Sequence, residues 1–163
     1  MRIATWNINS VRLRIAHVLR FIKEHDIDVL CLQETKTQDE FFPRKDFEQI
    51  GMKYISLRGE KSYNGVAIIS NGPFLKESFT NFCGLEDTRH ISVILKNKIT
   101  LHNFYVPAGG DIPDRKINAK FEHKIRFINE MDKFFENQEN KNHSDERCHH
   151  FQSENNGKIP FPL

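Results

Sequence analysis

The residues best placed to do chemistry are a carboxylate and an amide, each at the end of a strand-like segment. Glu34 follows the apolar run 29–32, and Asn7 lies near the end of the strand-like segment 2–8. Carboxylate and amide oxygens suit Mg²⁺, which often binds one or two carboxylates plus substrate phosphate and keeps several waters. We therefore expect Asn7 and Glu34 to hold a hard cation. Position alone equally allows Glu34 to be a solvated strand terminus.

Further polar side chains are candidates for the same site. Tyr105 lies near the end of a third strand-like segment, so its hydroxyl could donate a hydrogen bond to a phosphate oxygen or stabilise a leaving group. A half-buried aromatic with its hydroxyl in water is the simpler interpretation. Arg89 and Lys120 could neutralise phosphate at the rim of a metal site. Each of these cations, taken alone, is more often an ordinary solvated charge.

A strand–helix–strand unit is predicted to position Asn7 and Glu34. The strand-like segment 2–8 is followed by Ser10 as a helix N-cap, an amphipathic helix and the buried strand 29–32. The two strands of such a unit are parallel, so their C-terminal ends emerge on the same side of the sheet. Open α/β sheets usually bind ligands on that side.

The rest of the chain is predicted to alternate short strands with two more helices. These elements are a helix at 43–50, strands at 53–58 and 65–70, a hairpin of 90–96 with 99–106, and a helix at 114–136. The last helix has a predicted buried stripe of Ile117, Phe121, Ile125, Ile128, Met131 and Phe135. From residue 137 onward neither a helix nor a strand period continues, so we expect a mixed α/β domain in 1–136 and a disordered tail in 137–163.

Composition indicates a folded protein that is not a membrane protein. The 163 residues are 38% hydrophobic, contain 14 Phe and have a formal net charge of +2, too balanced to indicate a polyanion partner by itself. Three distant cysteines suggest neither a disulfide framework nor a zinc site, and a reducing cytoplasm fits them best. No window reaches the roughly 18 apolar residues of a membrane span.

Four ordered motifs give the sequence a specific resemblance. They are TWNINSVR at 5–12, LQETK at 32–36, YNGVA at 63–67 and NFYVPAG at 103–109. With them the chain resembles the exonuclease III family, whose members are abasic-site endonucleases and 3′ exonucleases of the wider endonuclease/exonuclease/phosphatase superfamily. The resemblance covers roughly residues 1–136.

The resemblance implies a fold, a reaction and roles for individual residues. The implied fold is the N-terminal half of a four-layer α/β sandwich of the deoxyribonuclease I-like type, with a mixed sheet flanked by helices. The implied activity is Mg²⁺-dependent cleavage of duplex DNA at abasic sites or 3′ ends in base-excision repair, with Mn²⁺ as an alternative metal, by a monomer. The resemblance makes Glu34 a metal ligand, Asn7 a metal or phosphate ligand and Tyr105 the active-site tyrosine. Arg89 and Lys120 match the family's basic positions near DNA. We add Arg12 as a further DNA contact.

The chain also departs from the family pattern. The Gly-Asp-x-Asn segment and the terminal Ser-Asp-His expected from the second half of the family are missing. The partial matches at 110–113 and 144–146 are interpreted as chance. We therefore expect a weak or inactive enzyme, a truncated or frameshifted product, and a sheet whose apolar residues in 29–32 and 66–69 lack a covering layer.

Two other functions stay open. One is a non-catalytic remnant that binds duplex DNA weakly or does nothing, with a steep loss of binding as salt rises. The other keeps the superfamily chemistry on a different phosphate ester, although the NFYVPAG motif favours DNA.

Overall fold

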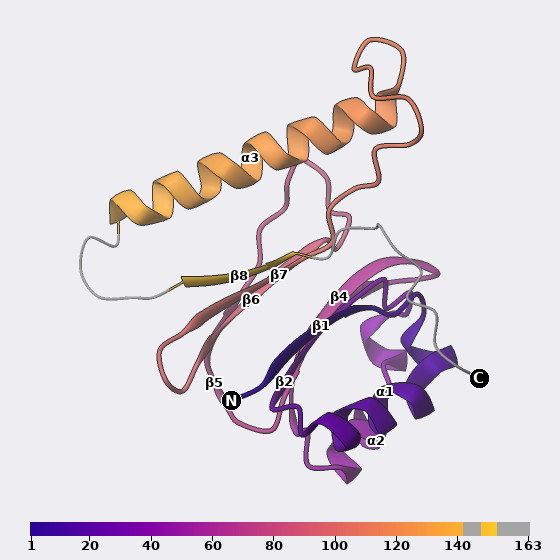
Figure 1. The fold of residues 1–163 in the computed structure, drawn as a ribbon, viewed down its shortest axis with the longest axis vertical. Helices are drawn as coiled ribbons and strands as arrows, with labels where there is room; N and C mark the ends of the chain where they lie inside the picture. Colours follow the sequence, from indigo (N-terminus) through magenta and orange to yellow (C-terminus); the bar gives the residue numbers. More distant parts are fainter. Residues whose placement is uncertain (142–147, 153–163) are drawn as a thin grey trace.

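Two four-stranded sheets pack face to face with helices on both outer sides (Figure 1). The computed structural model describes residues 1–141 and 148–152. The order of layers is helices α1 and α2, a first sheet, a second sheet and helix α3. The expected mixed α/β fold with sheets flanked by helices is therefore confirmed, and this chain, predicted as half of a four-layer sandwich, contributes to all four layers.

The first sheet has the strand order β1-β2-β4-β3. Strands β1 and β2 are parallel, and α1 connects them as predicted; β2, β4 and β3 are antiparallel neighbours. The elements of this part are β1 (Ile3–Asn7), α1 (Val11–His25), β2 (Val29–Gln33), the short 3₁₀ helix η1 (Asp39–Phe41), α2 (Arg44–Gln49), β3 (Tyr54–Glu60) and β4 (Tyr63–Ser70).

The second sheet has the order β5-β6-β7-β8. Its first three strands are antiparallel neighbours, while β8 pairs with β7 in parallel. These elements are β5 (Phe74–Ser78), β6 (His90–Leu95), β7 (Thr100–Phe104), α3 (Ala119–Lys141) and β8 (Cys148–Gln152). The hairpin predicted around residues 97–98 is present, whereas β5 was not among the predicted strands.

The core between the sheets corrects one prediction. The apolar residues in 29–32 of β2 and 66–69 of β4 were expected to lack a covering layer, but all of them are buried. Val29 and Cys31 of β2 pack with Ile68 of β4 against the second sheet, which contributes Ile91 and Leu101. The prediction of an exposed apolar face was wrong because the chain itself supplies the opposing sheet.

Helix α3 starts later and ends later than predicted. Asn118 caps it, since the side-chain Oδ1 accepts hydrogen bonds from the backbone N–H groups of Lys120 and Phe121. Ile117 therefore precedes the helix and is 71% exposed, not buried as expected, while Phe127 of α3 is buried.

The boundary predicted at residue 136 lies inside α3, which continues to Lys141. Residues 138, 139 and 141 are Gln, Glu and Lys, which favour a helix over an abrupt end. Residues 148–152 form β8, because the edge of β7 offers backbone groups for pairing. The rest of the tail predicted to be disordered, 142–147 and 153–163, lies outside the described residues.

Candidate active site

The ends of the parallel strands β1 and β2 bring the amide and the carboxylate together. Asn7 pairs in register with Gln33, the last residue of β2, and Glu34 directly follows it. The amide Nδ2 of Asn7 donates a hydrogen bond of 2.7 Å to Oε1 of Glu34. The predicted meeting of these residues is found, but the group that faces the carboxylate is the amide nitrogen. Asn7 thus holds the Glu34 side chain in place.

The loop that carries Glu34 is fixed by backbone hydrogen bonds to both flanking segments. The carbonyl of Glu34 accepts from the N–H of Ser10 at 2.7 Å, and the N–H of Thr35 donates to the carbonyl of Gly65 at 3.1 Å. Ser10 was predicted to cap α1, but its side chain makes no capping hydrogen bond. The start of α1 is tied to the Glu34 loop through backbone atoms instead.

Gly65 has a structural role in this loop that the sequence did not reveal. Its φ is +91°, and a Cβ there would lie 2.1 Å from Oγ1 of Thr35. Glycine is the residue that tolerates both the left-handed backbone and the close approach. The YNGVA motif therefore supports the turn after Glu34.

The second sheet contributes Tyr105 and Arg89. Tyr105 follows β7 and its side chain hydrogen-bonds to Glu34. The guanidinium of Arg89 lies over the Tyr105 ring, 4.7 Å from the centroid, and pairs with the Asp87 carboxylate. Arg89 is only 8% exposed. It therefore supports Tyr105 from within the protein instead of projecting into solvent.

Glu34 is held in its charged form. Burial raises the pKa of this carboxyl, but hydrogen bonds from Asn7, Lys36 and Tyr105 together lower the pKa by more than burial raises it. The pKa therefore lies below its ordinary value. The Lys36 ammonium lies 3.0 Å from Oε2 of Glu34 and donates to Oδ1 of Asn9 at 2.5 Å. A cation thus already fits between these two oxygen donors.

A buried amide network lies beneath the site and connects the two sheets. Asn103 of β7 donates from Nδ2 to the carbonyls of Leu32 and Ala67, each at 2.9 Å. Its Oδ1 accepts from Nε2 of Gln33 at 2.6 Å, and the same nitrogen donates to Oγ1 of Thr5. Gln33 and Asn103 both stand in the motifs that carry the resemblance, but nothing in their spacing predicts that they meet.

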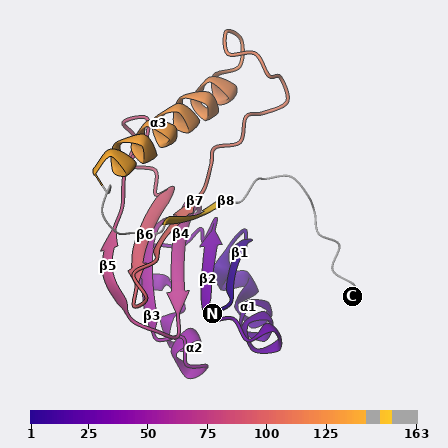
Figure 2. The ribbon, with the colours of Figure 1, turned by 60° about the vertical axis from the view of Figure 1, so that its left-hand side comes forward.

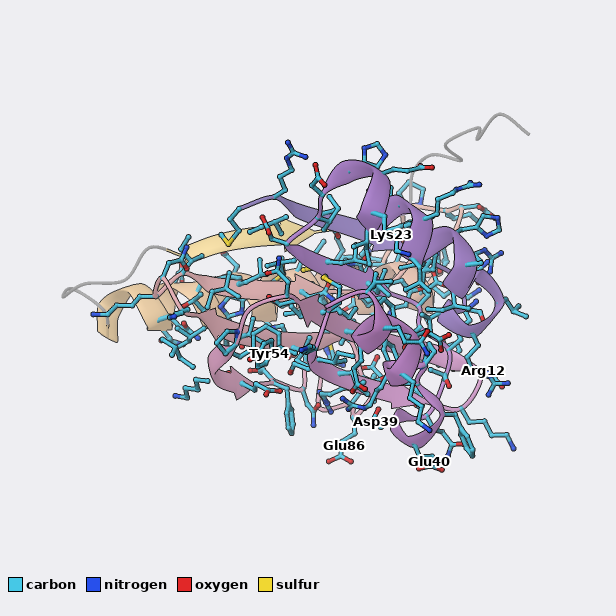
Figure 3. All side chains as sticks on the ribbon, turned by 90° about the horizontal axis from the view of Figure 1, so that it is seen from below. Arg12, Lys23, Asp39, Glu40, Tyr54 and Glu86 are labelled. Carbon is cyan, nitrogen blue, oxygen red and sulfur yellow. The ribbon has the colours of Figure 1, made fainter. Side chains whose placement is uncertain are left out.

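The remaining predicted basic residues, Arg12 and Lys120, lie in helices α1 and α3. Arg12 projects from α1 (Figure 3) and lines a hollow of about 830 Å³ together with Lys36 and Lys61. Lys36 connects this hollow to Glu34. Lys120 lies in the first turn of α3, and within residues 1–141 no hydrogen bond or ion pair joins it to Glu34.

Only one of the two partial motifs lies in the described part of the chain. Residues 110–113 lie in the loop before α3, where Asp111 is exposed and the Asn118 amide donates to the carbonyl of Ile112. Residues 144–146 lie outside the described residues. Across the described part of the chain, no group of three or more His, Cys, Asp or Glu side chains could hold a metal ion, and no helix is long and apolar enough to cross a membrane.

A family model described as the Endonuclease/Exonuclease/phosphatase family matches residues 4–149. An exodeoxyribonuclease III of Haemophilus influenzae is 27% identical over 146 residues, which is 86% of this chain and 53% of that protein. An exodeoxyribonuclease of Bacillus subtilis is 36% identical over 75 residues, 43% of this chain and 28% of that protein.

Solved structures of other proteins share this fold, and the matches cover a similar share of this chain. An AP endonuclease from Archaeoglobus fulgidus has a TM-score of 0.74 and 33% identity, covering 84% of this chain and 52% of that one. The 3′ phosphatase NExo from Neisseria, bound to a product DNA hairpin, has a TM-score of 0.76 and 26% identity, and the match covers 86% of this chain and 53% of that one. The chain thus spans about half the length of these relatives.

Proposed function

Because the chain belongs to the Endonuclease/Exonuclease/phosphatase family and is exonuclease III-like within it, we propose that it forms part of a divalent-metal-dependent DNA phosphodiesterase. The substrate would be duplex DNA with abasic sites or 3′ ends, in base-excision repair. The observation that carries the proposal is the contact of Asn7, Glu34 and Tyr105, which come from three separate motifs and two sheets.

The donor set fits a hard cation. Glu34 would ligate Mg²⁺ or Mn²⁺ through its carboxylate, and Asn9 offers an amide oxygen across the position that the Lys36 ammonium occupies. One carboxylate with amide oxygen, water and phosphate oxygen is a ligand set that Mg²⁺ accepts. When bound, the metal would supply charge stabilisation for phosphoryl transfer and lower the pKa of a bound water.

The chain's own residues would position the reacting groups. Asn7 orients the Glu34 carboxylate through its 2.7 Å hydrogen bond. The Tyr105 hydroxyl donates a hydrogen bond to Glu34 in this structure. It could instead donate a hydrogen bond to a phosphate oxygen or to the leaving oxygen. Arg89 keeps the Tyr105 ring in place from below.

The hollow beside the site would bind the DNA backbone. Arg12, Lys36 and Lys61 present three cations there, and cations of this kind contact phosphate without reading the sequence. Lys120 at the start of α3 is proposed as a more distant DNA contact.

A second candidate is a non-catalytic remnant that binds duplex DNA weakly. It is favoured by two family motifs, Gly-Asp-x-Asn and Ser-Asp-His, that these 163 residues do not contain. A missing general base or a missing charge-stabilising group each costs about 10²–10⁴ in rate. We therefore expect the isolated chain to be a weak enzyme at most.

A nicking assay on an abasic-site duplex tests the proposal. At high protein concentration we expect cleavage with Mg²⁺ and none with EDTA, and we expect Glu34→Gln to lower the rate by about 10²-fold or more. Glu40→Gln is the matched control, since Glu40 lines the same hollow without contacting Asn7. Cleavage that survives in Glu34→Gln or in EDTA would refute the proposed site, and binding without cleavage would favour the remnant.

A further inference from the structure

A buried pair of amide side chains joins the two sheets beneath the candidate active site. The sheets stack face to face, with β2 against β7 (Figure 2). Across this contact Nε2 of Gln33 donates a hydrogen bond of 2.6 Å to Oδ1 of Asn103, and both side chains are fully buried. Gln33 comes directly before Glu34 in the chain, and Asn103 comes two residues before Tyr105. The amide pair therefore lies close along both strands to the point where Glu34 and Tyr105 meet.

The amide pair fixes the position of β7 over the first sheet. Nδ2 of Asn103 also donates to the carbonyls of Leu32 and Ala67, each at 2.9 Å, so one side chain of β7 is attached to both β2 and β4. Nε2 of Gln33 also donates to Oγ1 of Thr5 in β1 at 2.9 Å. Hydrogen bonds weaken steeply when their geometry departs from the preferred angles. Three strands of the first sheet are therefore held in one position relative to β7.

The apolar side chains between the sheets fix that position less tightly. The buried members of this cluster are Val29, Cys31, Val66, Ile68, Ile91, Val93, Leu95 and Leu101. Because apolar burial is non-directional, the cluster favours contact between the sheets but selects only weakly how one sheet lies over the other. The directional hydrogen bonds of Gln33 and Asn103 make that selection.

The amide pair contributes less to stability than its hydrogen bonds suggest. Oε1 of Gln33 is buried, and no described residue donates a hydrogen bond to it. A buried acceptor that the protein leaves without a donor lowers stability. Replacing a buried polar pair by apolar side chains of similar shape is often close to neutral for the same reason. Geometry is thus the larger contribution of this pair.

We infer that Gln33 and Asn103 are positioning residues that hold Tyr105 opposite Glu34. The N–H of Tyr105 donates to the carbonyl of Arg89 at 2.8 Å and so continues the pairing of β7 with β6. Since side chains alternate along a strand, Tyr105 faces the first sheet as Asn103 does. A displacement of Asn103 would therefore displace Tyr105 from Glu34. The inference rests on the proposed function and deepens it, because Tyr105 is the group proposed to donate to the phosphate.

The Tyr105 signal in NMR provides a test that does not need activity. The full chain is labelled with ¹³Cζ-tyrosine, and Tyr105→Phe identifies the signal of Tyr105 among the three tyrosines. Glu34→Ala removes the acceptor of the Tyr105 hydroxyl and gives the signal of the broken contact. Asn103→Leu and Gln33→Met remove the amide pair while roughly keeping the side-chain shapes. Each should shift the Tyr105 signal toward its position in Glu34→Ala.

Ile68→Val is the matched control for this test. Ile68 is fully buried in the layer between the sheets, so the smaller side chain leaves a cavity and lowers stability without removing a hydrogen bond. The Tyr105 signal should stay at its wild-type position. An unshifted signal in Asn103→Leu and Gln33→Met, or an equal shift in Ile68→Val, would overturn the inference. Gln33→Met decides alone if Asn103→Leu does not fold, because Gln33 makes fewer hydrogen bonds than Asn103.

The nicking assay provides the second test. Because the amide pair acts through Tyr105, Gln33→Met should lower kcat by about tenfold or more and leave KM close to the wild-type value. Gln33→Met combined with Tyr105→Phe should be no slower than Tyr105→Phe alone. Losses that multiply in the double variant would overturn the inference. A wild-type chain that does not cleave would count against the proposed function, whereas the shift of the Tyr105 signal in the same chain would support the positioning role.

Discussion

The amide Nδ2 of Asn7 donates a 2.7 Å hydrogen bond to Oε1 of Glu34, and so connects the ends of two parallel strands. The contact is a side-chain hydrogen bond between the first two motifs of the sequence, which backbone hydrogen bonds also join. It also fixes the carboxylate that the proposed metal would require, before any metal is bound.

Asn7→Ala should raise the pKa of the Glu34 carboxyl. Burial raises that pKa, and the Asn7 hydrogen bond is the largest of the contributions that lower it. Without this hydrogen bond the charged form is less favoured, so protonation should occur at higher pH. A ¹³C NMR titration of the Glu34 carboxyl measures the change. Asn9→Ala is the control, because Asn9 contacts Lys36 instead of the carboxylate, and its effect should be smaller. Equal shifts in both variants would contradict the assigned role of Asn7.

Gly65→Ala should destabilise the fold more than Gly51→Ala. Both glycines have a left-handed backbone, with φ of +91° and +88°. An added Cβ at Gly65 would lie 2.1 Å from Oγ1 of Thr35, whereas one at Gly51 meets nothing within 4 Å. We expect a loss of about 1–2 kcal/mol of unfolding free energy for Gly51→Ala, and a larger loss for Gly65→Ala because overpacking adds about 1–3 kcal/mol. Urea unfolding of the two variants makes the comparison, and equal losses would show that the clash is relieved at no cost.

His90 should make the stability depend on pH in the acid range. Burial, the neighbouring His102 and the charge of Arg58 lower the pKa of His90 from 6.5 to about 3. Between these two values the unfolded chain binds a proton that the folded chain does not, so stability falls as the pH falls from 6.5 toward 3. One such group contributes up to about 1.4 kcal/mol per pH unit.

His90→Phe removes this contribution. Its ring can stay among Phe82 and Phe104, which contact the His90 ring. The variant loses the hydrogen bonds to Thr80 and His102, so it starts from lower stability, but its unfolding free energy should decline less steeply than that of the wild type below pH 6.5. Parallel curves for the two proteins, measured by urea unfolding at several pH values, would contradict a neutral buried His90.

Regular periodicity and strand-end positions carried most of what could be predicted from the sequence. The parallel placement of β1 and β2, and with it the meeting of Asn7 and Glu34, follows from a short strand–helix–strand unit. The second sheet was harder to predict, because β5 and β8 depend on neighbours far along the chain and have no strong pattern of their own. Asn103 shows the same limit, since its buried hydrogen bonds to β2 and β4 exist only once the two sheets stack.

The polar contacts around Glu34 could not be predicted from the sequence either. A lone lysine in a sequence is usually an ordinary solvated charge, but Lys36 pairs with Glu34 and Asn9. Arg89 was expected at the rim of the site and is instead buried beneath Tyr105. In both cases a left-handed turn or a neighbouring ring, not the residue type, decides where the charge lies.

Lys36→Met should increase the affinity of the chain for Mg²⁺. The Lys36 ammonium lies between Oε2 of Glu34 and Oδ1 of Asn9, so a metal ion that uses these oxygens must displace it or share the space with it. Removing the competing cation also removes a repulsive positive charge within a few ångströms, where such interactions are least screened. Titration calorimetry with Mg²⁺ should therefore show a lower Kd for Lys36→Met. Lys61→Met is the control, because it removes the same charge from the same hollow without a contact to Glu34, and its Kd should stay close to that of the wild type. If Lys36→Met binds Mg²⁺ more weakly, Lys36 assists the metal instead of competing with it, and the proposed position of the cation is wrong.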